Sequence, residues 1–297
     1  HYFLHGTGFH DLYEGTTPVK APGKYFPELM TERSLAFIEK SKDKPFFLYF
    51  PLNIPHYPEQ APKKFAEPFK DMKSPARKSY ATIMHATDHY IGRVVNKIEE
   101  LGLRKDTLFI YMSDNGHSEE TGNHIRVDNH KSGHPKGHFY GASGGGFTGK
   151  WKGQKGTLLE GGIRVPAIIS FPGKLPQGET RDQIVTAMDW LPTVMELCGI
   201  DGEKGDPKLD GHSLLTIIRS PKRESGYKGT LHFQWHTQWA VRMGEWKLIG
   251  RGTKASFLGN VHDEQPERKN YAKEKPELVA RLLEMHEKWS VEVKPAK

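Results

Sequence analysis

Residues 108–116 have the sequence LFIYMSDNG, in which a short apolar run ends in an acid, an amide and a glycine. The apolar half is rich in residues that favour β-structure and predicts a strand buried on both faces of a sheet. Asp114 and Asn115 follow the end of this strand, where open α/β sheets bind ligands. Their side-chain oxygens are the hard donors that Ca²⁺ or Mg²⁺ requires. The alternative is an ordinary β-turn, because Asp, Asn and Gly are common turn residues.

Strands and helices alternate on both sides of this stretch. The apolar runs at 46–50 and 165–171 predict two further buried strands. Helices are predicted over 79–101 and 189–197, and another is expected to begin at Thr31 as its N-cap. Strand, helix, strand is a βαβ pattern. We therefore predict an α/β fold with a mixed, mostly parallel central sheet flanked by helices.

The last quarter of the chain has a different pattern. Residues 199–228 are polar, with clusters of Gly, Pro and Lys, and they mark a domain boundary. Three short strands and an amphipathic helix are predicted after it, over 231–235, 239–243, 246–249 and 276–292. We predict an N-terminally incomplete α/β domain at 1–215 and a small α+β subdomain of antiparallel strands and one helix at 226–297.

The composition excludes several classes of protein. Hydrophobic residues make up 36% of the chain, and no apolar run approaches the about 18 residues of a membrane-spanning helix. The net charge of +7 is spread along the chain without a compact basic block, so nucleic-acid binding is not expected. Cys198 is the one cysteine and is expected to be a small buried residue. The start at His1 has no signal-peptide features and reads as the middle of a longer chain.

Two basic side chains stand in loops suited to binding an anion. His56 lies between prolines, just after the predicted strand at 46–50. Lys155 lies in the sequence KGQKGTLLEGGIRVP at 152–166, where glycines allow close approach of a ligand to the backbone. A fixed ammonium there suits an anionic oxygen, and the spacing of a Walker loop is absent. Arg164 at the end of this stretch is interpreted either as a partner of a carboxylate or as a contact to substrate.

The segment 117–146 is rich in histidine and glycine and poor in aliphatic residues. Such a long loop in a compact domain is usually functional or disordered. We interpret His117 and His138 as substrate-facing, with a structural role as the equal alternative. The C-terminal strands supply further candidates for a wall of the pocket: His232, Gln234, Trp235 and His236.

Three stretches occur in an order that resembles the type I sulfatases, the formylglycine-dependent members of the alkaline phosphatase superfamily. They are NIPH at 53–56, SDNG at 113–116 and KGTLLEGGIRVP at 155–166. The sequences DWLPT at 189–193 and LDGHSL at 209–214 are similar to that family's downstream pattern. The resemblance covers nearly the whole chain.

The resemblance implies a function and a role for each residue. Asp114 and Asn115 match two ligands of a calcium ion. His56 matches the histidine that binds sulfate and protonates the leaving oxygen, and Lys155 matches the lysine that contacts both sulfate and leaving group. The implied reaction is hydrolysis of a sulfate ester, with a sulfated carbohydrate or another organic sulfate as substrate. The implied location is the periplasm or the outside of the cell.

The sequence departs from the family at the nucleophile. Type I sulfatases oxidise the first residue of Cys/Ser-x-Pro-x-Arg to formylglycine, and no such motif occurs here. In the family this motif and an Asp pair that completes the metal site precede the stretch matched by residue 1. We therefore expect this chain alone to be inactive. Two alternatives stay open: a phosphate or phosphonate ester hydrolase of the same superfamily, and a non-catalytic homologue that binds sulfated glycans.

Overall fold

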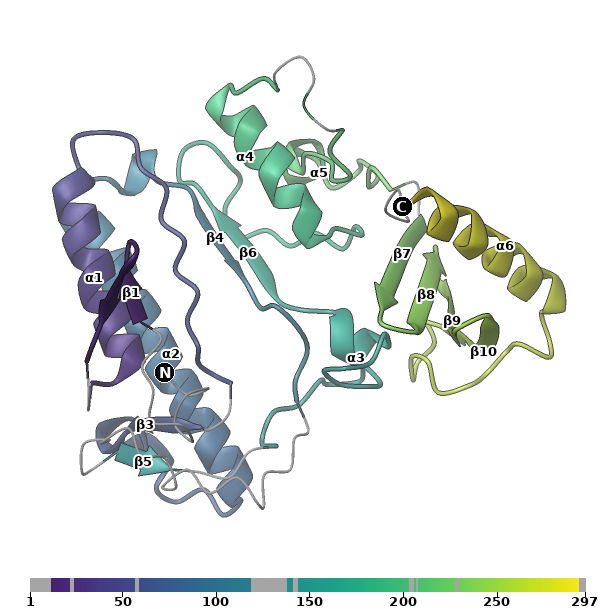
Figure 1. Ribbon diagram of the computed structural model, residues 1–297, viewed down its shortest axis with the longest axis horizontal. Helices are drawn as coiled ribbons and strands as arrows, with labels where there is room; N and C mark the ends of the chain where they lie inside the picture. The colour runs from purple at the N-terminus through teal and green to yellow at the C-terminus, as the bar shows by residue number, and fades with distance from the viewer. Residues whose placement is uncertain are drawn as a thin grey trace. The chain divides into compact units, whose positions relative to one another are not determined.

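The computed structural model describes the chain over residues 12–21, 24–56, 59–118, 138–140, 144–202, 206, 208–227 and 230–293. The chain forms two compact units. The first consists of residues 1–107 and 117–147, and the second of residues 108–116 and 148–297. Figure 1 shows the elements of each unit, which are described in turn. None of the helices in the described ranges has the length and apolar character needed to cross a membrane.

The long helix α2 (Pro75–Glu100) organises the first unit and confirms the predicted helical spacing. It begins earlier than predicted because the Ser74 side chain accepts a hydrogen bond from the Arg77 backbone nitrogen at 3.4 Å, an N-cap. It ends before Gly102, whose φ of +71° is a conformation that glycine adopts at little cost.

Helix α1 (Phe26–Ser41) packs against α2. The apolar core of this unit consists of buried side chains from α2, from the N-cap of α1 and from the segment between the two helices: Tyr25, Ile54, Ala61, Phe65, Ile83, Ala86 and Tyr90. One carboxylate also joins the helices. Glu28 on α1 accepts hydrogen bonds from the Tyr90 hydroxyl at 2.9 Å and from Arg93 at 2.5 Å. Apolar burial and this polar bridge together fix the helix pair.

Two short antiparallel pairs belong to the described part of the first unit. They are β1 (Leu12–Glu14) with β2 (Thr17–Val19), and β3 (Gln60–Pro62) with β5 (His138–Tyr140). Short 3₁₀ turns occupy Lys63–Phe65, Glu67–Phe69 and Arg104–Asp106. Because β5 pairs with β3, the backbone of the segment around His138 lies beside the chain that follows the NIPH loop.

Two predictions for the first unit are wrong. Thr31 is not an N-cap, because α1 already begins at Phe26 and the Thr31 hydroxyl donates to the Pro27 carbonyl within the helix at 2.7 Å. Residues 46–50 are not a buried strand: they have no strand assignment, and Phe47 and Tyr49 are 82% and 76% exposed. An apolar run becomes a strand only when another strand pairs with it, and no described strand pairs with this one.

The second unit contains the strand predicted from LFIYM. Strand β4 (Phe109–Met112) pairs with β6 (Ala167–Ser170), the other predicted central strand, with Phe109 opposite Ser170. The pairing is antiparallel, because the intervening segment returns the chain in the opposite direction. No parallel pair occurs among the described residues, so the mostly parallel central sheet remains a prediction. Tyr111 and Ile168 are exposed, so β4 and β6 are not buried on both faces.

Hydrogen bonds to one buried acid, Asp189, connect the DWLPT and LDGHSL stretches. Asp189 ends a 3₁₀ turn (Ala187–Asp189) and opens α4 (Trp190–Cys198). Its carboxylate accepts hydrogen bonds from the His212 backbone nitrogen at 2.8 Å and from the Tyr227 hydroxyl at 2.5 Å. Helix α5 (Leu215–Arg219) follows the second stretch. This part of the family-like pattern therefore serves the fold.

Cys198 is exposed at the C-terminal end of α4, so the prediction that it is buried is wrong. Gly199 follows with φ +64° and ends the helix in the left-handed conformation. A small apolar residue at a helix end is often buried, but here the end of α4 lies at the surface of its unit.

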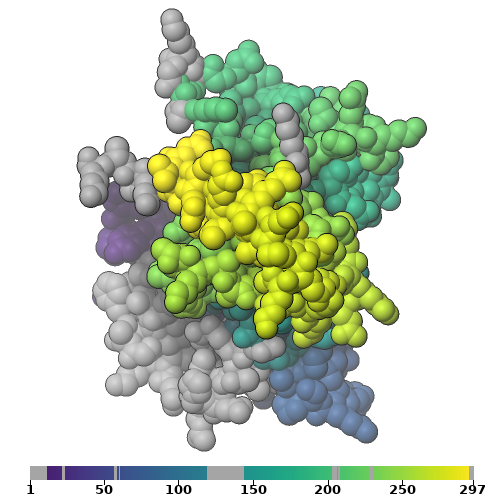
Figure 2. Space-filling view, turned by 90° about the vertical axis from the view of Figure 1, so that its right-hand side faces the viewer, coloured from purple at the N-terminus to yellow at the C-terminus, as the bar shows by residue number. Residues whose placement is uncertain are grey.

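A four-stranded antiparallel sheet and one helix form the C-terminal part of the second unit, and three of these strands and the helix were predicted. The strands are β7 (Thr230–Trp235), β8 (Gln238–Met243), β9 (Trp246–Arg251) and β10 (Lys254–Asn260), in the order β10-β9-β8-β7. Helix α6 (Pro276–Glu292) packs along this sheet in Figure 1. Its outer surface, in yellow in Figure 2, is continuous with that of the strands. Strand β10 has no counterpart among the predicted strands.

The sheet and α6 meet in an apolar core that contains two stacked pairs of rings. The core side chains are Trp239, Val241, Leu248, Leu258 and Leu282. The rings of His286 and Trp239 are 4.1 Å apart at 13°, and those of His232 and Trp289 are 5.1 Å apart at 6°. Burial lowers the pKa of both histidines below its ordinary value.

These stacked histidines predict a loss of stability in acid. Each has a lower pKa in the folded chain than the about 6.5 of an unfolded histidine, so a proton binds the unfolded state more readily. The contribution of the neutral rings is complete above about pH 6.5 and is lost as pH falls through the lowered folded pKa. Urea unfolding from pH 8 to pH 4.5 should show this decline. The variant His286→Phe keeps an aromatic ring and should weaken the dependence; identical profiles would contradict the interpretation.

Candidate functional site

The two predicted metal ligands stand directly after β4. The Ser113 backbone nitrogen still donates to the Pro166 carbonyl at 3.3 Å, and the chain then turns. The Asp114 carboxylate accepts a hydrogen bond from the Asn115 backbone nitrogen at 2.9 Å. The Asn115 side-chain nitrogen donates to the Gly116 carbonyl at 2.9 Å, which leaves the amide oxygen as its metal-binding atom. The stretch is thus both a turn and a pair of oxygen donors. The β-turn and the metal site, which the sequence suggests as alternatives, are therefore compatible.

These donors fit part of a calcium site. Calcium takes about six to eight oxygen ligands, and carboxylate and amide oxygens are among those it prefers. The described residues contain no group of three or more His, Cys, Asp or Glu side chains placed to hold a metal. Asp114 and Asn115 are therefore suited to supply two ligands of a larger set.

A close contact between glycines joins this turn to the lysine-bearing stretch. The Gly116 backbone nitrogen donates to the Gly162 carbonyl at 2.9 Å. A Cβ atom on Gly116 would lie 1.9 Å from the Gly161 carbonyl oxygen, far inside van der Waals contact. Only glycine permits this approach. The Asp114–Asn115 turn and the short helix α3 (Glu160–Ile163) are thereby held next to each other in a fixed position.

Lys155 occupies the tip of a tight turn. The Thr157 backbone nitrogen donates to the Gln154 carbonyl at 3.0 Å, and the Thr157 hydroxyl donates to the same carbonyl at 2.8 Å. Gly156 has φ +85°, as the third position of a type II turn requires. The turn is tied to α3 because the Gly161 nitrogen donates to the Lys152 carbonyl at 2.7 Å. The ammonium is thus carried by a constrained backbone.

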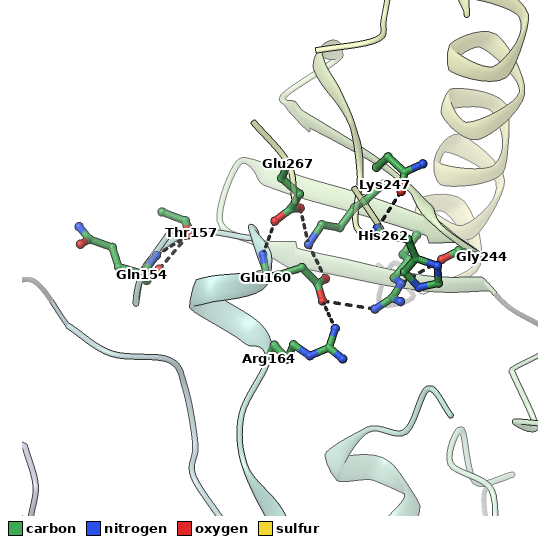
Figure 3. A network of polar contacts seen from close by, with 10 residues as sticks. Gln154, Thr157, Glu160, Arg164, Gly244, Lys247, His262 and Glu267 are labelled. Carbon is green, nitrogen blue, oxygen red and sulfur yellow. Dashed lines mark hydrogen bonds and ion pairs between the residues drawn. The ribbon is translucent and has the colours of Figure 1, made fainter. Parts of the chain in front are cut away.

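The base of this stretch is a buried carboxylate. Glu160 forms ion pairs with Lys247 at 2.8 Å, Arg164 at 3.0 Å and Arg242 at 3.4 Å, as Figure 3 shows. Burial alone would raise the pKa of the Glu160 carboxyl, but the attraction of Lys247 and the two arginines holds it below its ordinary value. Of the two roles considered for Arg164, pairing with a carboxylate is the one observed. Its guanidinium also lies 4.0 Å from the centre of the Trp151 ring.

The three predicted histidines lie in the first unit. His56 is half-buried at the end of the NIPH loop, where the Asn53 side-chain oxygen is buried without a hydrogen bond. His117 packs edge-on against Tyr80, with ring centroids 6.3 Å apart. His138 lies on β5, with its backbone opposite Pro62.

The structure thus brings together the loops of Asp114, Asn115 and Lys155 within one unit. The histidines of the loop at 119–137, which the sequence also singled out, fall outside the described residues. Sequence reasoning missed Lys247, Arg242 and Glu267, which surround Glu160. The available signal was a lysine between Trp246 and Leu248 in a predicted strand.

The chain matches the family model "Sulfatase" over residues 1–200. It belongs to the sulfatase family. Residues 150–287 also match the model "N-sulphoglucosamine sulphohydrolase, C-terminal". Among curated relatives, human Arylsulfatase D is 31% identical over 207 residues. That match covers 69% of this chain and 31% of the relative, so this sulfatase chain spans about a third of the relative's length.

Solved structures have the same fold. Ps i-CgsB in complex with k-i-k-neocarrahexaose is 25% identical with a TM-score of 0.77, and the match covers 97% of this chain and 61% of that one. The phosphonate monoester hydrolase SpPMH from Silicibacter pomeroyi is 15% identical with a TM-score of 0.61, over 98% and 66% of the two chains. The second likeness shows the fold alone. These matches support a sulfatase-like architecture for this chain.

The glycine contact predicts that Gly116→Ala is destabilising. The added methyl group would overlap the Gly161 carbonyl, so the turn or α3 must shift, with a cost of about 1–3 kcal/mol. Urea unfolding of the chain measures this cost. The matched control is Gly202→Ala, where the added Cβ would lie 3.6 Å from the Asp206 carboxylate and the change should stay within about 0.5 kcal/mol. Equal stability of the two variants would contradict the described geometry.

Proposed function

We propose that the whole protein is a sulfuric ester hydrolase that acts on a sulfated carbohydrate. The observation that carries the proposal is the hydrogen bond between Gly116 and Gly162, which joins the Asp114–Asn115 turn to the Lys155 stretch of a sulfatase-family chain. Oxygen donors for a divalent metal and a fixed ammonium on linked loops suit a substrate whose reacting group is a compact oxyanion.

The four residues that match family motifs each have a role in this proposal. Lys155 offsets negative charge on the sulfuryl oxygens and the leaving oxygen as the ester bond breaks. His56 binds the sulfate and donates a proton to the leaving oxygen. Asp114 and Asn115 bind calcium, which would supply further positive charge to the sulfuryl group. The formylglycine nucleophile of the family has no counterpart in this chain, so the proposal applies to the whole protein. Export to the periplasm or out of the cell remains a prediction.

The position of Trp235 supports a carbohydrate substrate. Trp235 ends β7 and is 46% exposed, and its indole ring lies 3.7 Å from where a Cβ of Gly156 would be. An exposed aromatic ring beside the lysine turn offers an apolar face on which a sugar ring can stack while its sulfate reaches the lysine. The complex of Ps i-CgsB with k-i-k-neocarrahexaose is consistent with such a ligand in a protein of similar fold.

The reaction class is tested with Lys155→Ala in the whole protein. The loss of a charge that stabilises the transition state should lower kcat for a sulfate ester by about 10²–10³ and leave the circular dichroism spectrum unchanged. Lys150→Ala in the same segment is the matched control, because its ammonium lies over Trp151 and has no assigned role. Unchanged turnover in Lys155→Ala would reject the role of the lysine.

The same assays separate the alternatives. Hydrolysis of phosphate or phosphonate esters without hydrolysis of sulfate esters would favour the phosphonate-hydrolase alternative. Binding of a sulfated glycan without hydrolysis of either ester would favour a non-catalytic homologue.

The carbohydrate is tested with Trp235→Ala. Loss of the stacking face should raise KM several-fold for a sulfated oligosaccharide and leave KM for a short alkyl sulfate unchanged, because the alkyl ester has no ring to stack on Trp235. Trp235→Phe keeps an aromatic face and should retain most of the oligosaccharide affinity. A parallel rise in KM for both substrates would show that the ring supports the loop and does not bind sugar.

A further inference from the structure

Lys247 on β9 is a fully buried charge, with a side chain that is 0% exposed. Its ammonium forms ion pairs at 2.8 Å with both Glu160 and Glu267. The second carboxylate oxygen of Glu267 accepts the backbone nitrogen of Glu160 at 2.7 Å. Figure 3 shows how the lysine lies between the two acids, which come from α3 and from the loop after β10. Two side chains of the C-terminal part thus hold both the backbone and the side chain of Glu160.

Stability alone does not account for this arrangement. Removal of charges from water costs several kcal/mol per ion, and well-packed apolar residues often stabilise a fold as well as a buried ion pair does. A buried ion pair differs from apolar packing because it fixes the relative position of its side chains: the charged atoms must stay within hydrogen-bonding distance of each other. Burial raises the pKa of the Glu267 carboxyl, in opposition to the attraction of Lys247. Glu267 is therefore held next to Glu160 although the removal of its carboxyl group from water is unfavourable.

Contacts from Glu160 continue to both predicted binding loops. The next residue, Gly161, donates to the Lys152 carbonyl at 2.7 Å and so holds the segment that leads into the Lys155 turn. Gly162 accepts the Gly116 nitrogen at 2.9 Å and so holds the Asp114–Asn115 turn. A displacement of Glu160 cannot occur without movement of one or both loops, because α3 is a single short turn of helix.

We propose that Lys247 and Glu267 are positioning residues for the binding site. They anchor Glu160 and thereby set the place of the Lys155 turn and of the Asp114–Asn115 turn. The catalytic role of Lys155 rests on the proposed function, but the anchoring itself does not. The C-terminal sheet is then a required part of the site and not a separate module.

The test is hydrogen–deuterium exchange of the chain, with Lys247→Met compared with the unaltered protein. Loss of the ammonium leaves two buried acids facing each other, so the amides of residues 152–163 should exchange about tenfold faster. The matched control is Lys269→Met, which removes an ion pair with Glu274 whose members are both 54% exposed and should leave these amides unchanged. Unchanged exchange at 152–163 in Lys247→Met would overturn the proposal.

A second variant separates positioning from general stability. Glu267→Gln removes the charge but keeps an oxygen that can accept the Glu160 nitrogen, so it is the milder change and remains informative if Lys247→Met does not fold. Faster exchange confined to 152–163 and 113–116 supports positioning. Equally faster exchange across β7–β10 and α6 indicates a structural role only and would reject the proposal.

Activity gives an independent readout in the whole protein. Glu267→Gln should lower kcat for a sulfate ester and change KM less, because it displaces Lys155 from the position required in the transition state. A normal kcat together with faster exchange at 152–163 would overturn the link to the site. If no ester is hydrolysed by the unaltered protein, the proposed function fails, while the exchange experiment still decides whether the anchor exists.

Discussion

The arrangement of the candidate site depends on the contact between the backbone at Gly116 and that at Gly161 and Gly162. A side chain at Gly116 would prevent this approach, because its Cβ would lie 1.9 Å from the Gly161 carbonyl oxygen. A Cβ on Gly161 would in turn lie 2.3 Å from the Gly153 carbonyl oxygen, in the segment that leads into the Lys155 turn. The glycines allow two loops that are distant in sequence to be joined directly by a main-chain hydrogen bond. The side chains that carry chemistry are then placed by the backbone, and they need no contact with each other.

The sequence predicts those parts of the fold in which one segment carries its own signal. The helices at 75–100 and 276–292 follow from apolar residues at helical spacing, and the hairpin at 243–246 follows from its glycine. The strand predicted at 46–50 is absent because strand formation depends on a pairing partner, which the local sequence does not specify. For the same reason the antiparallel pairing of β4 with β6 could not be read from the spacing of strands and helices.

The same distinction applies to the site. Asp114, Asn115 and Lys155 stand in short motifs, so roles for them could be proposed from the sequence alone. The roles of Lys247 and Glu267 could not be proposed in this way, because these residues lie 87 and 107 positions from Glu160 in the sequence, and a buried ion pair leaves no periodic signal in either segment. A charged residue inside an otherwise apolar strand, such as Lys247 between Trp246 and Leu248, indicates that a partner of opposite charge lies elsewhere in the chain, but it does not say where.

The pairing of β4 with β6 has a consequence for how the chain behaves in solution. In the described part of the chain each of these strands has a single neighbour, so the outer edge of each carries backbone groups able to join a further strand. Ile168 and Tyr111 are exposed on the same pair, and the apolar side chains of Phe47 and Tyr49 are exposed in the first unit. Such edges are templates for intermolecular β-pairing, so we expect this chain by itself to self-associate as its concentration rises.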